Sequence, residues 1–285
     1  MLKSFCIKTN NRKILNYLLI NLEIINLKDL YISNLKFKLY NNIIVHYKGK
    51  NFVTFYSEFS KVISSCIIKF YEKDIIKRII NCNYFYFTSK EQRKIFEIVN
   101  SYLTTDEIDE CNLRKSSIDI SCIEYFSNNK SCILDGFVNF RINDYIKILD
   151  YLVDIAVDKF VIDREYLEFI DLLKCYINSK KSNTALVHLI YQNQESTLLD
   201  EFKKNINIDN TALDNKYVSD ISFSSNDYTL NALLTLLPKK IYIHLIDDCE
   251  DEFINTLKLI FNDRIYICNN CDICKIYKFA KTNKL

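Results

Sequence analysis

The spacing of apolar residues divides the chain into three stretches. Residues 1–58 alternate as short strands at 2–9 and 35–56, with a helix predicted between them at 11–25. Residues 59–182 follow a helical period, and residues 183–285 alternate strands with helices. We therefore predict an α+β fold: a small N-terminal α/β region, a central helical region, and a C-terminal α/β region with a parallel sheet that ends in a cysteine cluster.

Two details of the first two regions matter later. Within residues 35–56, the run Lys48-Gly49-Lys50 is a candidate for the turn between paired strands. Residues 104–129 are polar and mixed, which indicates a loop with a short helix.

The central block is more regular. Apolar residues from Tyr145 to Phe160 share one helical face, with acidic residues opposite. Asp163 is typical of a helix N-cap, so we predict that a second helix starts there and packs antiparallel to the first.

The last region favours strands joined by crossover helices. Helices are predicted at 227–237 and 250–262, where Pro238 ends the first of them. Such alternation predicts a parallel sheet with right-handed connections. The strands that we expect to form it are 185–191, 218–223, 240–246 and 264–268.

Composition narrows the function. The 285 residues contain two glycines, so a glycine-rich phosphate loop cannot form, and a net charge of +2 gives no general attraction to nucleic acid or membrane. We expect no membrane span and no secretory signal, because apolar runs are short and none follows Lys3. A cytoplasmic location follows as an expectation. The eleven cysteines are then expected as free thiols or metal ligands.

The best candidates for a metal site are Cys268, Cys271 and Cys274, which follow one another at intervals of three residues. Only about 0.02 such arrays are expected by chance in a chain of this composition. Cys249 follows the strand at 240–246, and parallel strands bring their carboxyl ends to one sheet edge, so we predict a Cys₄ zinc site with Cys249 as the fourth ligand. His244 is the weaker choice because it lies inside the strand.

Other interpretations stay open. The three cysteines also suit an iron–sulfur or thiol redox site, or reduced thiols without ligand. The acidic residues around Cys249 suit the N-terminus of the following helix better than a divalent cation.

The histidines belong to no recognisable catalytic triad. Basic residues near aromatics in the first region suit either nucleic-acid contact or a solvated sheet edge.

A structural motif is expected near the start of the central block. Gly136 is expected to permit a turn that a side chain would block, with Asp135 as a cap. Arg141 lies near a helix start, where a cation is unfavourable, so we expect it to pair with Glu165 or Glu168 and brace the two helices rather than bind a ligand.

Four segments stand out together: Asp135-Gly136-Phe137-Val138-Asn139-Phe140-Arg141, Arg164-Glu165-Tyr166-Leu167-Glu168-Phe169-Ile170, Pro238-Lys239-Lys240-Ile241-Tyr242-Ile243-His244 and the three clustered cysteines. In combination they resemble the YtxC family of sporulation proteins from endospore-forming bacteria. The resemblance covers roughly residues 130–285. It implies a cytoplasmic protein linked to spore formation and implies no particular reaction.

The leading hypothesis is therefore a non-enzymatic accessory or regulatory protein of sporulation, with a protein partner and a zinc module. A nucleic-acid-binding protein that uses the basic N-terminal region is the second hypothesis. An enzyme with its site at the C-terminal sheet edge is the third.

Overall fold

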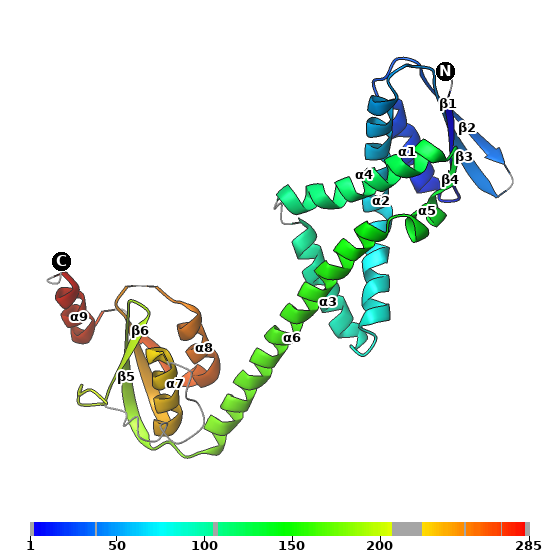
Figure 1. The fold of residues 1–285 in the computed structure, drawn as a ribbon. Coiled ribbons are helices and arrows are strands. Elements are labelled where there is room, and N and C mark those ends of the chain that lie inside the picture. The colour runs from blue at the N-terminus through cyan, green and yellow to red at the C-terminus, as the bar shows by residue number, and fades with distance from the viewer. Residues whose placement is uncertain are drawn as a thin grey trace, which may run out of the picture. The chain divides into compact units, whose positions relative to one another are not determined.

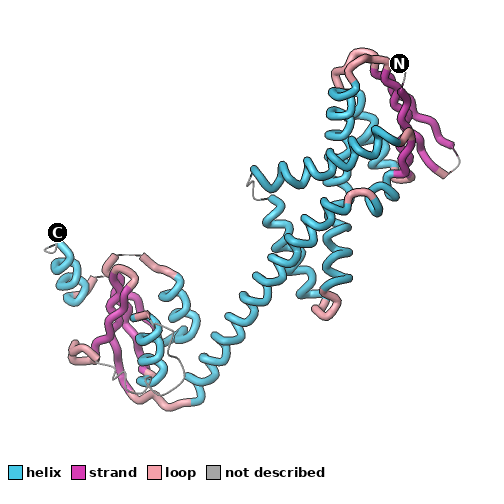
Figure 2. Tube along the Cα trace, viewed as in Figure 1, coloured by secondary structure: helices cyan, strands magenta, loops and turns pink. Residues whose placement is uncertain are grey.

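The computed structural model describes residues 3–37, 39–104, 108–206, 224–247, 249–268 and 270–282 (Figures 1 and 2). Its helices and two four-stranded sheets confirm the predicted α+β class. The chain forms two compact units, Met1–Ile162 and Asp163–Leu285. The first unit joins the predicted N-terminal region and most of the helical region around one core. No described helix is long and apolar enough to cross a bilayer.

The sheet of the first unit has the order β2-β3-β1-β4. Phe5 and Ile7 of β1 pair with Val45 and Ile43 of β3 and turn their side chains to the core. Phe5 also stacks with Phe55, in the helix that follows the β2–β3 hairpin, at 5.5 Å between ring centroids. The strands are β1 (Lys3–Thr9), β2 (Leu30–Phe37), β3 (Tyr40–Tyr47) and β4 (Ser131–Ile133), with α1 (Arg12–Glu23) between β1 and β2.

The predicted paired strands at 35–56 are partly wrong. Strands β2 and β3 are antiparallel, with Phe37 opposite Tyr40, and α2 (Phe52–Asn83) already begins inside the predicted strand. The Asn51 side chain accepts a hydrogen bond from the backbone N–H of Thr54 and caps this helix. The predicted turn residue Gly49 instead lies against the Tyr47 ring, where a Cβ would come within 2.3 Å of the hydroxyl.

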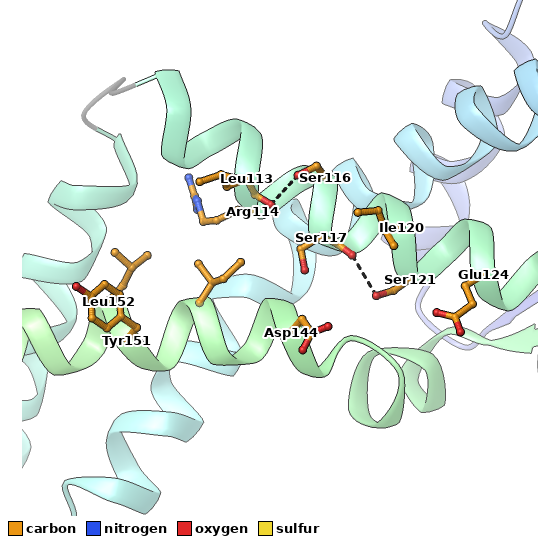
Figure 3. A pocket seen from close by; sticks show the side chains of 11 residues that line it. Leu113, Arg114, Ser116, Ser117, Ile120, Ser121, Glu124, Asp144, Tyr151 and Leu152 are labelled. Carbon is orange, nitrogen blue, oxygen red and sulfur yellow. Dashed lines mark hydrogen bonds between the residues drawn. The ribbon is translucent and has the colours of Figure 1, made fainter.

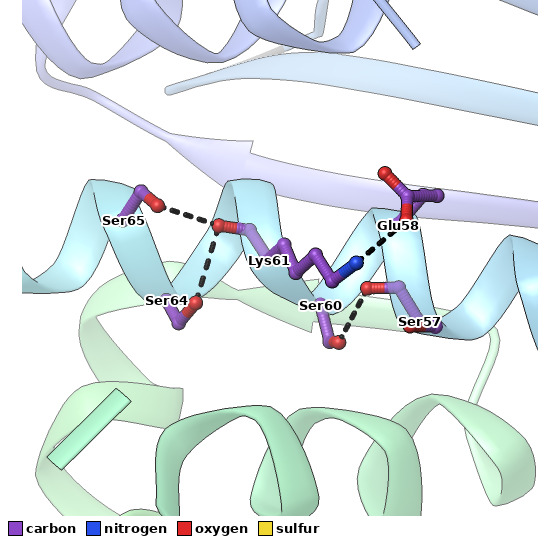
Figure 4. Close-up of polar contacts among 6 residues, drawn as sticks. All are labelled: Ser57, Glu58, Ser60, Lys61, Ser64 and Ser65. Carbon is purple, nitrogen blue, oxygen red and sulfur yellow. Dashed lines mark hydrogen bonds and ion pairs between the residues drawn. The ribbon is translucent and has the colours of Figure 1, made fainter. Parts of the chain in front are cut away.

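The predicted loop at 104–129 is also wrong, because residues 108–128 form α4 (Ile108–Asn128), which follows α3 (Ser89–Thr104). Ile118, Cys122 and Phe126 lie four residues apart and are buried, so a narrow apolar face is enough to hold a mostly polar helix. On α2, buried Ser60 and Ser64 bond carbonyls of their own helix (Figure 4). Their small side chains let α4 pack closely there.

The central block is one helix, α6 (Asn143–Ser179), after the short α5 (Leu134–Phe140). The prediction of two antiparallel helices is therefore wrong, and Asp163 lies inside a helix rather than at its N-cap. The acidic residue lies on the helix surface, where helical backbone tolerates it.

The second unit confirms the predicted parallel pairing. Strand β7 (Pro238–Leu245) pairs in parallel with β5 (Thr184–Gln192) on one side and with β8 (Ile265–Cys268) on the other. An antiparallel edge strand that the sequence pattern did not reveal, β6 (Glu195–Leu199), gives the order β6-β5-β7-β8. The predicted strand at 218–223 lies outside the described residues.

The helices of this unit lie on both sides of the sheet. Residues of α7 (Ser225–Leu236) and α8 (Glu252–Phe261) share a core with Ile241 and Ile243 of β7. The opposite face carries a smaller cluster, in which Ile190 and Ile246 pack against Ile273 of α9 (Asp272–Thr282). The two helices α7 and α8 therefore cover one face, and α9 covers part of the other.

A buried ion pair joins two helices of the first unit. Arg114 Nη1 donates to Glu72 Oε2 at 2.7 Å, and the Tyr145 hydroxyl donates to the same oxygen at 2.6 Å. Burial and then the charge of Glu72 raise the pKa of Tyr145 well above its ordinary value, so the phenol remains a donor. This network joins α2, α4 and α6.

We expect Arg114→Ala to lower the free energy of unfolding by about 3–5 kcal/mol, because the Glu72 carboxylate would stay buried without its cation. Chemical denaturation measures the change. Lys61→Ala, which breaks the exposed Lys61–Glu58 pair, is the matched control and should leave the midpoint nearly unchanged. Equal effects of the two variants would contradict a buried network.

Candidate metal centre

The candidate site is built where β7 and β8 end. His244 and Cys268 are direct neighbours in the parallel ladder of these strands. The chain then turns into α9, which begins just after Cys271 and carries Cys274 in its first turn. Two strand ends and one helix N-terminus thus bring an imidazole and three thiols together.

The four side chains form a compact group. Their ligand atoms all lie within 4.8 Å of one another. His244 Nδ1 lies 3.3 Å from Cys274 Sγ and 3.4 Å from Cys271 Sγ. Cys274 Sγ lies 3.8 Å from both Cys268 Sγ and Cys271 Sγ. Such a group can hold a metal ion.

These separations match a tetrahedral zinc site. Zinc–sulfur bonds of about 2.3 Å and zinc–nitrogen bonds of about 2.0–2.1 Å place tetrahedral ligands about 3.8 Å apart for two sulfurs and about 3.6 Å apart for sulfur and nitrogen. The observed sulfur–sulfur distances agree with the first value, and the nitrogen–sulfur distances are slightly shorter than the second. These four distances are therefore close to those of a tetrahedral site.

Burial and hydrogen bonds shift the pKa values of the ligand side chains, in different directions. Burial, with the nearby His188, lowers the pKa of His244 to about 4, so its ring is neutral and can coordinate at neutral pH. Burial raises the pKa of the Cys271 thiol, but the backbone N–H groups of Cys274 and Ile273 and the neighbouring thiols outweigh it, and its pKa is lowered overall. Burial first, and then the adjacent thiols, raise the pKa of Cys268 to about 11.

Cys249, the fourth ligand predicted from the sequence, does not belong to this group. It is exposed in the connection from β7 to α8, and that connection leads to the sheet face that α8 covers. Ile241 and Ile243 point to this same face, so strand alternation turns His244 to the opposite face, toward α9. His244 takes the place that we assigned to Cys249, and the alternation of β7 was the signal that could have identified it.

Known proteins show where the chain belongs. The model of the YtxC-like family matches residues 57–266, which is most of the sequence. The chain belongs to the YtxC-like family. A curated relative, the uncharacterized protein YtxC of Bacillus subtilis (strain 168), is 21% identical over 216 residues, which cover 70% of this chain and 73% of the relative. No solved structure matches the chain.

The family match and the candidate site overlap only in part. His244 lies inside the matched range of this YtxC-like chain, whereas the three clustered cysteines follow residue 266. The ligand set therefore combines a residue of the family's matched region with a segment that comes after it.

The motif predicted around Gly136 has a different structure. Gly136 lies in α5 with a negative φ, and a Cβ there would meet only Ile133 at 4.0 Å, so no turn requires glycine. Asp135 lies in the first turn of α5 and accepts a hydrogen bond from the Tyr71 hydroxyl at 2.6 Å, and no side chain caps the helix at Ile133. The Tyr71 contact links α5 to α2.

The predicted brace by Arg141 does not form. Its guanidinium lies above the Tyr125 ring, 5.8 Å from the centroid. Because α6 is continuous, Glu165 lies about 33 Å along the helix from Asn143, at 1.5 Å per residue. Glu168 Oε1 instead lies 3.7 Å from Nε of Arg164, which belongs to the same helix.

His188 of β5 is a supporting residue that the sequence analysis did not identify. Its Nδ1 lies 3.0 Å from His244 Nε2. With His244 Nδ1 facing the sulfurs, Nε2–H donates to His188, and this hydrogen bond fixes the orientation of the ligand ring. Burial lowers the pKa of His188, which keeps the accepting nitrogen unprotonated.

We expect His188→Leu to weaken zinc binding by about 10–100-fold, because His244 loses the acceptor that orients it. Competition with a chromophoric chelator measures the affinity. His188→Asn, which offers an acceptor oxygen at a similar position, should recover most of the loss. Unchanged affinity in His188→Leu would show that the hydrogen bond has no role in binding.

Proposed function

We propose that the second unit is a zinc-binding module, with His244, Cys268, Cys271 and Cys274 as the ligands. The observation that supports this most is the set of four known distances between ligand atoms, which are close to those of a tetrahedral site. Three thiolates and one imidazole are a common structural zinc ligand set. An iron–sulfur cluster is less well supported, because clusters are usually held by four cysteines.

The ligand count supports a structural rather than a catalytic zinc. A catalytic zinc keeps one position open for water or substrate, whereas four protein ligands close the coordination shell. Ligation would fasten α9 to the sheet, since Cys271 and Cys274 are on the helix side and His244 and Cys268 on the strand side. The binding free energy would then add to the free energy of folding.

The same closed site underlies the wider proposal of a non-enzymatic accessory or regulatory protein in spore formation, located in the cytoplasm. The link to spore formation rests on the resemblance of this chain's motifs to a family of sporulation proteins, and the family match over residues 57–266 supports that resemblance. The zinc would keep the C-terminal helix in place for this role, and no chemistry at the metal is required.

Elemental analysis of the full chain, purified without a metal-affinity tag, tests the zinc proposal. We expect one zinc per chain in the wild type, no zinc in Cys274→Ser, and full zinc in Cys249→Ser, because Cys249 lies outside the ligand group. A chain without zinc, or loss of zinc in Cys249→Ser, would contradict the assignment.

A genetic experiment separates the role from the metal. Deletion of the gene in the host organism should lower the count of heat-resistant spores. Cys249→Ser should restore that count, and Cys274→Ser should not. Normal spore counts in the deletion strain would refute the sporulation role while leaving the zinc site intact.

A further inference from the structure

Helix α6 exposes a continuous row of apolar side chains. Ile155, Ile162, Phe169 and Tyr176 follow one another at intervals of seven residues, and their exposed fractions are 37%, 65%, 52% and 44%. An interval of seven residues in an α-helix keeps side chains on nearly the same face, which is the pattern of a helix that packs along another helix. We call this row the α6 stripe; with half-buried Ile148 and Leu173 and exposed Tyr151, it runs about 42 Å.

The α6 stripe is symmetric about Ile162. Ile155 and Phe169 lie seven residues to either side of it, and Tyr151 and Leu173 lie eleven residues to either side. Ile148 and Tyr176 lie fourteen residues to either side. A two-fold axis through Ile162 would bring each residue of one helix against its mirror position on an antiparallel copy, so this symmetry would place apolar residues against apolar residues along both helices.

The charges along the edge of the stripe favour the antiparallel direction. Around an axis at Ile162, Lys159 of one copy lies opposite Glu165 of the other, and Asp158 lies opposite the Tyr166 ring. A parallel pair in register would instead place Asp158 against Asp158 and Glu165 against Glu165. Opposite charges favour association and like charges oppose it.

We propose that α6 packs against α6 of a second copy of this chain, antiparallel, with the two-fold axis at Ile162. The pair would bury the whole stripe on both helices. A specific interface needs roughly 1,000 Å² of buried surface, and the stripe offers about four heptads of helix for it. The inference concerns assembly and does not depend on the zinc site.

A groove in the first unit extends the apolar surface at one end of the stripe. It has a volume of about 460 Å³ and lies between α4 and α6. Tyr151 and Ile148 of α6 line it together with exposed Leu113 and Ile120 of α4 (Figure 3). In the proposed pair, Tyr176 and Leu173 of the second copy lie opposite these α6 residues, so the groove gives the aromatic ring of Tyr176 additional apolar surface.

Sedimentation equilibrium of the full chain tests the interface. We expect the wild type to be a dimer at micromolar concentration and Ile162→Glu to raise the dissociation constant at least about 100-fold, because two carboxylates would meet at the axis. Leu167→Glu is the matched control: Leu167 is 56% exposed on the same helix but lies about 140° around it from Ile162, so this variant should stay dimeric.

Circular dichroism of both variants checks that α6 remains folded. A monomeric wild type would overturn the proposal and leave the stripe to a different protein. Equal loss of the dimer in Leu167→Glu, or a dimeric Ile162→Glu, would overturn it as well.

The direction of the helices is tested by charge reversal. Lys159→Glu and Glu165→Lys should each raise the dissociation constant several-fold, and an equimolar mixture of the two variants should associate more tightly than either alone, because opposite charges then meet across the interface. A dimer that Ile162→Glu abolishes, but that neither reversal affects, would refute the antiparallel arrangement.

Discussion

The arrangement of the second unit depends on one constraint, the parallel pairing of β7 with β8 in the register that sets His244 beside Cys268. A shift of one residue would exchange the two faces of β7: His244 would be buried among the apolar residues of α7 and α8, and Ile241 and Ile243 would leave that core. In the observed register, Ile241 and Ile243 pack against α7 and α8, and the His244 imidazole lies on the opposite face of the sheet. Helix α9 then needs only a short connection to bring Cys271 and Cys274 to the same point.

The sequence predicted this site in part. The parallel strands and the grouping of the three clustered cysteines followed from periodicity and spacing, because both are local properties. The face on which each connection leaves the sheet is not local. Cys249 was chosen because it follows β7, but the chain there leads to α8 on the far face. His188 could not be found from spacing, because its contact with His244 joins two strands 56 residues apart.

The first unit shows a second limit of sequence patterns. Helix α4 was mistaken for a loop because tertiary packing holds it through a narrow buried face and few apolar residues. We divided α6 at Asp163 because aspartate is a preferred N-cap residue. Aspartate is also tolerated on the exposed surface of a helix, and Asp163 lies in such a position. Once α6 is known to be continuous, the residues of the α6 stripe lie along one face, and their symmetry about Ile162 becomes visible. Neither feature can be seen while the helix is divided in two.

X-ray absorption at the zinc edge of the purified, tag-free full chain tests the central claim most directly, because it counts the sulfur and nitrogen ligands around the metal. Our account predicts three sulfurs at about 2.3 Å and one nitrogen at about 2.0–2.1 Å, which is the signature of His244 with Cys268, Cys271 and Cys274. Four sulfurs would return Cys249 to the site and contradict the role of His244. A shell of oxygens would mean that the cluster does not hold the metal at all.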